Sequence, residues 1–114
     1  MNTKEYEKWV IDFYRNRGWY EYDPFVRINY LTEEVGEVSR AVRDIEIGRD
    51  RPDESEKSLD TKKDNLLEEL GDVLDNIIIL ADKYDMTLED VMDKHIKKLE
   101  KRFEQDQKED DKED

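Results

Sequence analysis

Apolar side chains recur at steps of three and four residues in four segments of the chain, a spacing that predicts amphipathic α-helices. The first segment covers about residues 3–17 and ends at the sequence RGWYEYDPF. The second begins after Asp23 and Pro24, which resemble a helix N-cap and a first-turn proline, and Gly48 is its expected end. The pattern therefore predicts an all-α domain of the four-helix type.

The two middle helices carry the longest apolar stripes. In the second helix, a narrow seam consists of Leu31, Val35, Val38, Val42 and Ile45. The third helix is expected to begin near Thr61, and its stripe consists of Leu66, Leu70, Val73, Leu74, Ile77, Ala81 and Tyr84. Because the four aliphatic residues 77–80 surround the helix, we expect a second subunit to cover part of them.

Polar segments separate and follow these helices. Residues 49–60 predict a mobile connector. The sequence TLED at 87–90 resembles a second N-cap, and the helix after it carries Leu88, Met92, Ile96, Leu99 and Phe103. Residues 105–114 are acidic and have no apolar side chain, so we expect a disordered tail after a folded domain at 1–104.

Composition narrows the class of protein. The 114 residues fit one small domain. The composition, with 46 % charged and 35 % hydrophobic residues, suits a small helical protein that buries more apolar surface by oligomerising. A net charge of −13 argues against nucleic acid as a partner, and the absence of cysteine excludes disulfides and thiolate zinc sites. The longest aliphatic stretch, 77–81, is too short to span a membrane, and we expect a soluble cytoplasmic protein.

Each middle helix places an acidic pair beside its apolar seam. With Leu31 at 0° on a helical wheel, Glu34 falls near 300° and Glu37 near 240°. In the third helix Glu69 and Asp72 take equivalent places, and Asn76 lies one turn beyond Asp72; the outer glutamates Glu33 and Glu68 point away. If the two helices pack through their seams, the four carboxylates converge.

Four converging carboxylates need a cation, because repulsion and desolvation would otherwise cost several kcal/mol. Oxygen ligands of this kind suit Mg²⁺ or Mn²⁺. Both pairs enclose a glycine, Gly36 and Gly71, which would permit close approach of the other helix or a ligand. The alternative is that these pairs are ordinary solvated helix faces in a chain with 33 acidic residues.

These motifs resemble those of a known family. EEVGE at 33–37, followed 32 residues after Glu37 by ELGD at 69–72, is similar to the EExxE…ExxD signature of MazG-like nucleoside triphosphate pyrophosphohydrolases, in the all-α NTP pyrophosphatase superfamily. The context is similar as well, with RGW before the second helix, GDVLDNIIILAD in the third and HIKKLEKRF near the end. The resemblance covers about residues 3–103.

The resemblance implies a four-helix domain that assembles into a dimer or a dimer of dimers. It implies hydrolysis of (d)NTPs between the α and β phosphates, which releases a nucleoside monophosphate and pyrophosphate and serves house-cleaning of the nucleotide pool. The family's metal ligands map onto Glu34, Glu37, Glu69 and Asp72, with Mg²⁺ as cofactor and Mn²⁺ as a substitute. Either Glu34 or Glu37 is the candidate general base.

Four further residues are candidates for binding the substrate. In similar proteins an aromatic residue at the RGW position helps to enclose the base, so Trp19 is the first choice for stacking. Asn76 is a candidate contact for sugar or phosphate. Similar proteins carry basic residues in the last helix, and Lys98 and Arg102 share one face of it, with Lys94 and Lys101 as neighbours that could equally be solvated surface.

Two other functions compete with the enzyme. One is a catalytically silent helical bundle that binds metal or nucleotide and has a regulatory role. The other is a structural or adaptor bundle without a metal site. The residues do not select a base or sugar: dUTP, dCTP and modified nucleotides all fit, and phosphoribosyl-ATP fits less well.

Overall fold

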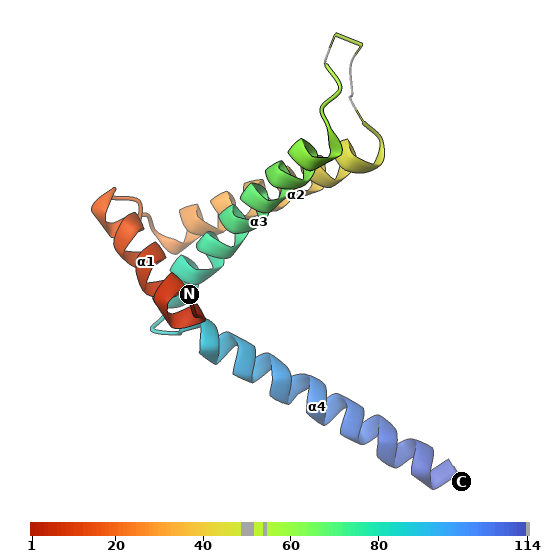
Figure 1. Cartoon of the computed structure of the whole chain (residues 1–114). Helices are drawn as coiled ribbons and strands as arrows, with labels where there is room; N and C mark the ends of the chain where they lie inside the picture. Colours follow the sequence, from red (N-terminus) through yellow and green to blue (C-terminus); the bar gives the residue numbers. More distant parts are fainter. Residues whose placement is uncertain (49–51, 54, 114) are drawn as a thin grey trace.

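The computed structural model describes residues 1–48, 52–53 and 55–113, with side chains to residue 104. The described residues contain four helices and no strand, which confirms the all-α prediction: α1 (Thr3–Asn16), α2 (Pro24–Glu46), α3 (Leu59–Asp82) and α4 (Leu88–Glu113). α2 and α3 lie antiparallel and side by side, α1 packs on α3, and α4 extends away from that group (Figure 1). The expected connector at 49–60 lies partly outside the described residues, at 49–51 and 54.

Side-chain caps explain where the helices begin. Asp23 accepts a hydrogen bond of 3.0 Å from the amide of Val26, and Pro24 is the first residue of α2, as the sequence predicts. Before α4, the Thr87 amide donates to Asp90 and the Asp90 amide donates to Thr87 Oγ1, which is a reciprocal capping box. The predicted start of α3 near Thr61 is wrong, because Ser58 is the N-cap and accepts from the Thr61 amide.

The core of the chain lies between α1 and α3. Val10, Ile78 and Ile79 are fully buried there, with Tyr6, Ile11, Tyr14, Tyr20 and Leu88 packed around them. Hydrogen bonds from Tyr6 to Asp75 and from Tyr20 to Asp82 join α1 and the turn after it to α3. α1 covers Ile78 and Ile79, whereas Ile77 and Leu80 are partly exposed, so cover of these two by a second subunit stays a prediction.

The described contacts of α4 with the rest of the chain, other than chain neighbours, lie near its beginning. The buried carboxylate of Glu7 on α1 accepts a hydrogen bond of 3.3 Å from the Leu88 amide. Beyond this contact the helix projects outward, and the radius of gyration is 19.2 Å, against about 13 Å for a compact chain of this length. Backbone helix continues through 105–113, where the sequence predicts a disordered tail. The domain boundary at 104 stays a prediction.

The apolar seams of α2 and α3 remain partly uncovered within one chain. Val35 is 52 % exposed and Leu70 is 47 % exposed, and apolar side chains of α4 beyond Leu88, such as Ile96 and Phe103, are exposed as well. Neither Gly36 nor Gly71 is required by a close approach, because an added Cβ would meet no atom within 4 Å. The single chain therefore does not close a four-helix bundle.

Candidate metal centre

Three of the four predicted carboxylates converge between α2 and α3. Glu34 of α2 and Glu69 and Asp72 of α3 each offer one carboxylate oxygen, and these oxygens lie within 4.8 Å of one another. The two helices position them because a spacing of three residues keeps Glu69 and Asp72 on one face of α3. We call these three residues the carboxylate cluster. The neighbouring Glu33 is exposed, as its angle on the wheel predicts.

The carboxylates repel one another electrostatically. Burial raises the pKa of Glu34, and the negative charges of Asp72, Glu69 and Glu37 raise it further. Burial also raises the pKa of Glu69, with added contributions from Asp72 and Glu37. Both shifts disfavour the charged form, and a bound cation would relieve this repulsion.

Glu37 lies beside the carboxylate cluster rather than within it. Its charge raises the pKa of Glu34 and of Glu69. Among the described residues, however, Glu37 is not one of the three whose carboxylate oxygens lie within 4.8 Å of one another. Together with Glu69, Glu37 lines a polar cleft of about 560 Å³ that opens toward the connector ends of α2 and α3. The structure therefore brings together three of the four predicted ligands and leaves Glu37 at the edge.

An aromatic pocket adjoins the carboxylate cluster on the other side. Its volume is about 310 Å³, and it is lined by Tyr14, Trp19, Tyr22, Arg27, Tyr30, Glu34, Asp72 and Asn76. Trp19, which the resemblance suggests for stacking on the base, and Asn76, expected one turn beyond Asp72, both line this pocket. The Trp19 amide donates a hydrogen bond of 2.9 Å to the carbonyl oxygen of Tyr14, which holds the indole at the end of α1.

Arg27 is the residue of this pocket that sequence reasoning missed. It is only 3 % exposed, its Nη1 donates a hydrogen bond of 2.9 Å to Asn76 Oδ1, and its Nη2 donates to the Trp19 carbonyl oxygen. Its Nε is buried without a hydrogen-bond partner. The available signal was its position, four residues before Leu31 in the apolar seam, where an arginine is unexpected.

Tyrosine rings surround the Arg27 guanidinium. The rings of Tyr14, Tyr30 and Tyr22 have centroids 5.3, 5.7 and 6.0 Å from its central carbon. These distances are within the range of cation–π attraction. Burial lowers the pKa of Arg27, while burial raises that of Tyr14 to about 12. The pocket therefore holds a buried cation against aromatic faces, next to the carboxylate cluster.

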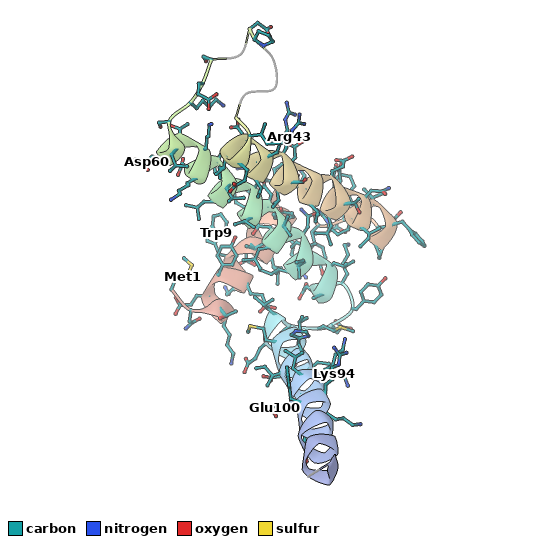
Figure 2. The ribbon with its side chains drawn as sticks, turned by 90° about the vertical axis from the view of Figure 1, so that its right-hand side faces the viewer. Met1, Trp9, Arg43, Asp60, Lys94 and Glu100 are labelled. Carbon is teal, nitrogen blue, oxygen red and sulfur yellow. The ribbon has the colours of Figure 1, made fainter. Side chains whose placement is uncertain are left out.

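The predicted phosphate-binding residues Lys98 and Arg102 lie elsewhere in the chain. Both are on α4, which extends away from α2 and α3 (Figure 2). Lys98 instead borders a separate surface hollow on α4, together with Met86, Asp90, Val91, Lys94, His95, Lys97 and Lys101. Within one chain these residues are not brought to the carboxylate cluster, and their assignment stays a prediction.

The donor set of the carboxylate cluster fits a divalent metal ion. All three converging groups are carboxylates, and hard oxygen ligands of this kind suit Mg²⁺ and Mn²⁺. The aromatic pocket beside the cluster can take a planar ring, and its shared members Glu34 and Asp72 place such a ring next to the metal position. The arrangement suits a ligand with an aromatic group at one end and a metal-binding anionic group beyond it.

The all-α fold and the carboxylate cluster are consistent with a metal-binding helical protein, and comparison with known proteins gives its family. The family model of the MazG nucleotide pyrophosphohydrolase domain matches residues 26–105. The chain is 58 % identical to the uncharacterized protein YvdC of Bacillus subtilis over 104 residues, which cover 91 % of this chain and 98 % of YvdC. The chain belongs to the MazG family, and it is a nucleotide pyrophosphohydrolase.

A solved structure supports the same assignment. The crystal structure of "the putative pyrophosphatase YPJD" from Bacillus subtilis is similar, with a TM-score of 0.61 and 27 % sequence identity. The similarity covers 86 % of this chain and 94 % of that one. In the part of this chain that the structure describes, no helix is both long and apolar enough to cross a membrane.

Proposed function

We propose that this protein is a Mg²⁺-dependent nucleoside triphosphate pyrophosphohydrolase that cleaves (d)NTPs between the α and β phosphates. The products are a nucleoside monophosphate and pyrophosphate. The observation that carries the proposal is that the carboxylate cluster and the aromatic pocket share Glu34 and Asp72. A base in the pocket would therefore leave its phosphates beside the metal ligands. The proposed role is house-cleaning of the nucleotide pool in the cytoplasm.

The proposed ligands of the metal are Glu34, Glu69 and Asp72, with Glu37 as a fourth. When bound, Mg²⁺ would polarise phosphoryl oxygens and lower the pKa of a water molecule. A glutamate that is not fully engaged with the metal would accept the proton of the attacking water, and the candidates are Glu34 and Glu37. Burial and the neighbouring carboxylates raise the pKa of Glu34 in the absence of metal.

In this proposal the aromatic pocket binds the nucleoside. Trp19 stacks on the base, and Asn76 contacts the sugar or the α-phosphate. Asn76 is 4 % exposed and both of its side-chain atoms are engaged, with Oδ1 accepting from Arg27 and Nδ2 donating to the Asp72 carbonyl oxygen at 2.8 Å. Its orientation is therefore fixed before a ligand arrives.

We further propose that the active protein is a homo-oligomer, either a dimer or a tetramer. Partial exposure of Val35, Leu70 and Leu74 along the seams of α2 and α3 supports this assembly, as does the exposed apolar side of α4. In such an assembly Lys98 and Arg102 stay candidates for contacting the substrate of another subunit.

The test is a product analysis with a panel of dNTPs, NTPs and modified nucleotides, in Mg²⁺, in Mn²⁺ and in chelator. Metal-dependent formation of monophosphate and pyrophosphate in equal amounts is the expected result, and the order of rates identifies the base. Formation of diphosphate and inorganic phosphate would contradict the proposed bond. Binding without any turnover would instead indicate the regulatory protein.

A further inference from the structure

The polar cleft and the aromatic pocket lie at opposite sides of the carboxylate cluster. On α2 the pocket residue Arg27 precedes Glu34, whereas the cleft residue Arg40 follows it. On α3 the order is reversed, because the cleft residue Asn65 precedes the cluster and the pocket residue Asn76 follows it. α2 and α3 run antiparallel (Figure 1). Both helices therefore give the pocket, the cluster and the cleft in the same spatial order.

The length of this arrangement suits an extended nucleotide. Asn65 and Asn76 are 11 residues apart on α3, which corresponds to about 16 Å along the helix axis. A ligand with its base in the pocket and its first phosphate at the cluster would therefore place its outer phosphates in the cleft. The cleft has room for them, with a volume of about 560 Å³.

The cleft also supplies positive charge near the carboxylate cluster, in addition to the buried Arg27 of the aromatic pocket. Among the described residues that line it, the charged ones other than Glu37 and Glu69 are Arg40, Arg43, Lys57, Asp44 and Asp53. Three of these five described residues are cations. Arg43 lies at the connector end of α2 (Figure 2).

Arg40 is the best placed of these cations. It follows Glu37 by three residues, so the two side chains are neighbours on one face of α2. Among the described residues the structure gives Arg40 no hydrogen bond and no ion pair, and the residue is exposed. A planar guanidinium with all its donors available can bind phosphate oxygens in a bidentate manner.

We propose that the cleft holds the β and γ phosphates of the substrate, and that Arg40 binds them and then the pyrophosphate that leaves. The inference rests on the proposed function. It orients the substrate with its base in the aromatic pocket and its outer phosphates in the polar cleft. In the reaction, the water oxygen forms a bond to the α phosphorus and the bond from that phosphorus to the bridging oxygen breaks. The bridging oxygen leaves with its electron pair on pyrophosphate, and a carboxylate takes one proton from the water. Arg40 stabilises the negative charge that develops on the leaving group.

The experiment compares Arg40→Gln with the wild-type protein in product inhibition of dNTP hydrolysis. We expect inhibition by inorganic pyrophosphate to weaken about tenfold or more, because hydrogen bonds to charged groups are lost. Inhibition by the nucleoside monophosphate should stay unchanged, because the aromatic pocket is intact. Arg40→Lys should restore part of the pyrophosphate inhibition. Lys8→Gln, which removes an exposed positive charge from α1, is the matched control.

Arg102→Gln tests the competing source of positive charge. If Arg102→Gln weakens pyrophosphate inhibition and Arg40→Gln does not, the inference is wrong and α4 of another subunit holds the outer phosphates. Equal melting temperatures of Arg40→Gln and wild type would show that the fold is retained, as expected for an exposed residue without a partner.

A second measurement separates failure of this inference from failure of the proposed function. Pyrophosphate is titrated into the full chain with Mn²⁺ in a calorimeter, with no nucleotide present. If the wild type hydrolyses a dNTP but Arg40→Gln binds pyrophosphate equally well, only the inference fails. In a third outcome the wild type hydrolyses no nucleotide but binds pyrophosphate, and Arg40→Gln does not bind it. The cleft is then an anion site and the proposed function fails. No hydrolysis and no pyrophosphate binding by the wild type would overturn both.

Discussion

Arg27 Nη1 on α2 donates a hydrogen bond of 2.9 Å to Asn76 Oδ1 on α3, and this bond joins the two helices beside the carboxylate cluster. The same guanidinium donates to the Trp19 carbonyl oxygen, so one side chain connects α2, α3 and the turn after α1. Within the described residues, Arg27 has no carboxylate partner, and tyrosine rings surround its charge instead. The aromatic pocket is therefore organised around a buried cation.

The first prediction concerns this hydrogen bond. Arg27→Met should lower the free energy of unfolding by about 1–3 kcal/mol, because the Asn76 and Trp19 oxygens lose their donor. It should also raise KM for the nucleotide, since Trp19 and Asn76 are no longer held in place. Denaturant unfolding is the measurement, and Arg40→Met, which removes an exposed guanidinium from the same helix, should change stability by less than about 0.5 kcal/mol. Wild-type stability of Arg27→Met would contradict the structural role given to Arg27.

The second prediction concerns stability and pH without metal. The folded chain raises the pKa of Glu34 and Glu69, so it binds protons there more tightly than the unfolded chain does. Stability is therefore lost as the pH rises from the ordinary glutamate pKa through the raised values. Above this window, in chelator, Glu34→Gln should be more stable than wild type, by less than about 1 kcal/mol because the site is partly solvated.

The measurement is chemical unfolding of both proteins on either side of that pH window. Below it the advantage of Glu34→Gln should vanish, because the wild-type carboxyl is then protonated. Adding Mg²⁺ above the window should stabilise the wild type more than the variant, since the ion binds the folded state. Equal effects of Mg²⁺ on both proteins would show that Glu34 is not a ligand.

The third prediction uses the two tryptophans as matched probes. Trp19 lines the aromatic pocket, whereas Trp9 is stacked on Phe13 and is 54 % exposed. In Trp9→Phe, an α,β-methylene nucleoside triphosphate with Mg²⁺ should change the fluorescence of Trp19 through stacking. In Trp19→Phe, the signal of Trp9 should not respond. A fluorescence response from Trp9 alone would show that the base does not bind in the aromatic pocket.

The fourth prediction concerns assembly. Leu70→Glu places a charge on the exposed seam of α3 and should dissociate the oligomer, which sedimentation equilibrium measures directly. Ile47→Glu is the control, because Ile47 is 75 % exposed at the end of α2 and outside the seams, and it should leave the mass unchanged. A monomeric wild type, or an assembled Leu70→Glu, would contradict the proposed interface.

Local features of the sequence predicted local features of the structure. The cap at Asp23 and the capping box at Thr87 and Asp90 form as expected, because each needs only residues within one turn. The helical period placed Glu34, Glu69 and Asp72 beside the seams, and packing of α2 on α3 then brought their oxygens together.

Features that depend on the packing of distant segments could not be predicted in the same way. Arg27 is buried because tyrosines from two parts of the chain surround it, and no spacing rule indicates this arrangement. The direction of α4 depends on contacts between segments far apart in the sequence, such as the bond from the Leu88 amide to Glu7 and the packing of Leu88 on the core. For that reason Lys98 and Arg102, the expected substrate contacts on α4, do not lie beside the carboxylate cluster within one chain.

The most direct test of the central claim is steady-state hydrolysis of the best dNTP by Asp72→Asn in Mg²⁺, with Asp64→Asn as control. Asp72 belongs to the carboxylate cluster, whereas Asp64 is exposed in the early turns of the same helix. We expect Asp72→Asn to lose at least about 100-fold in kcat, because a lost metal ligand removes several kcal/mol of charge stabilisation. Its melting temperature in chelator should equal or exceed that of wild type, and Asp64→Asn should keep full activity. Full activity of Asp72→Asn would contradict the assignment of the catalytic site.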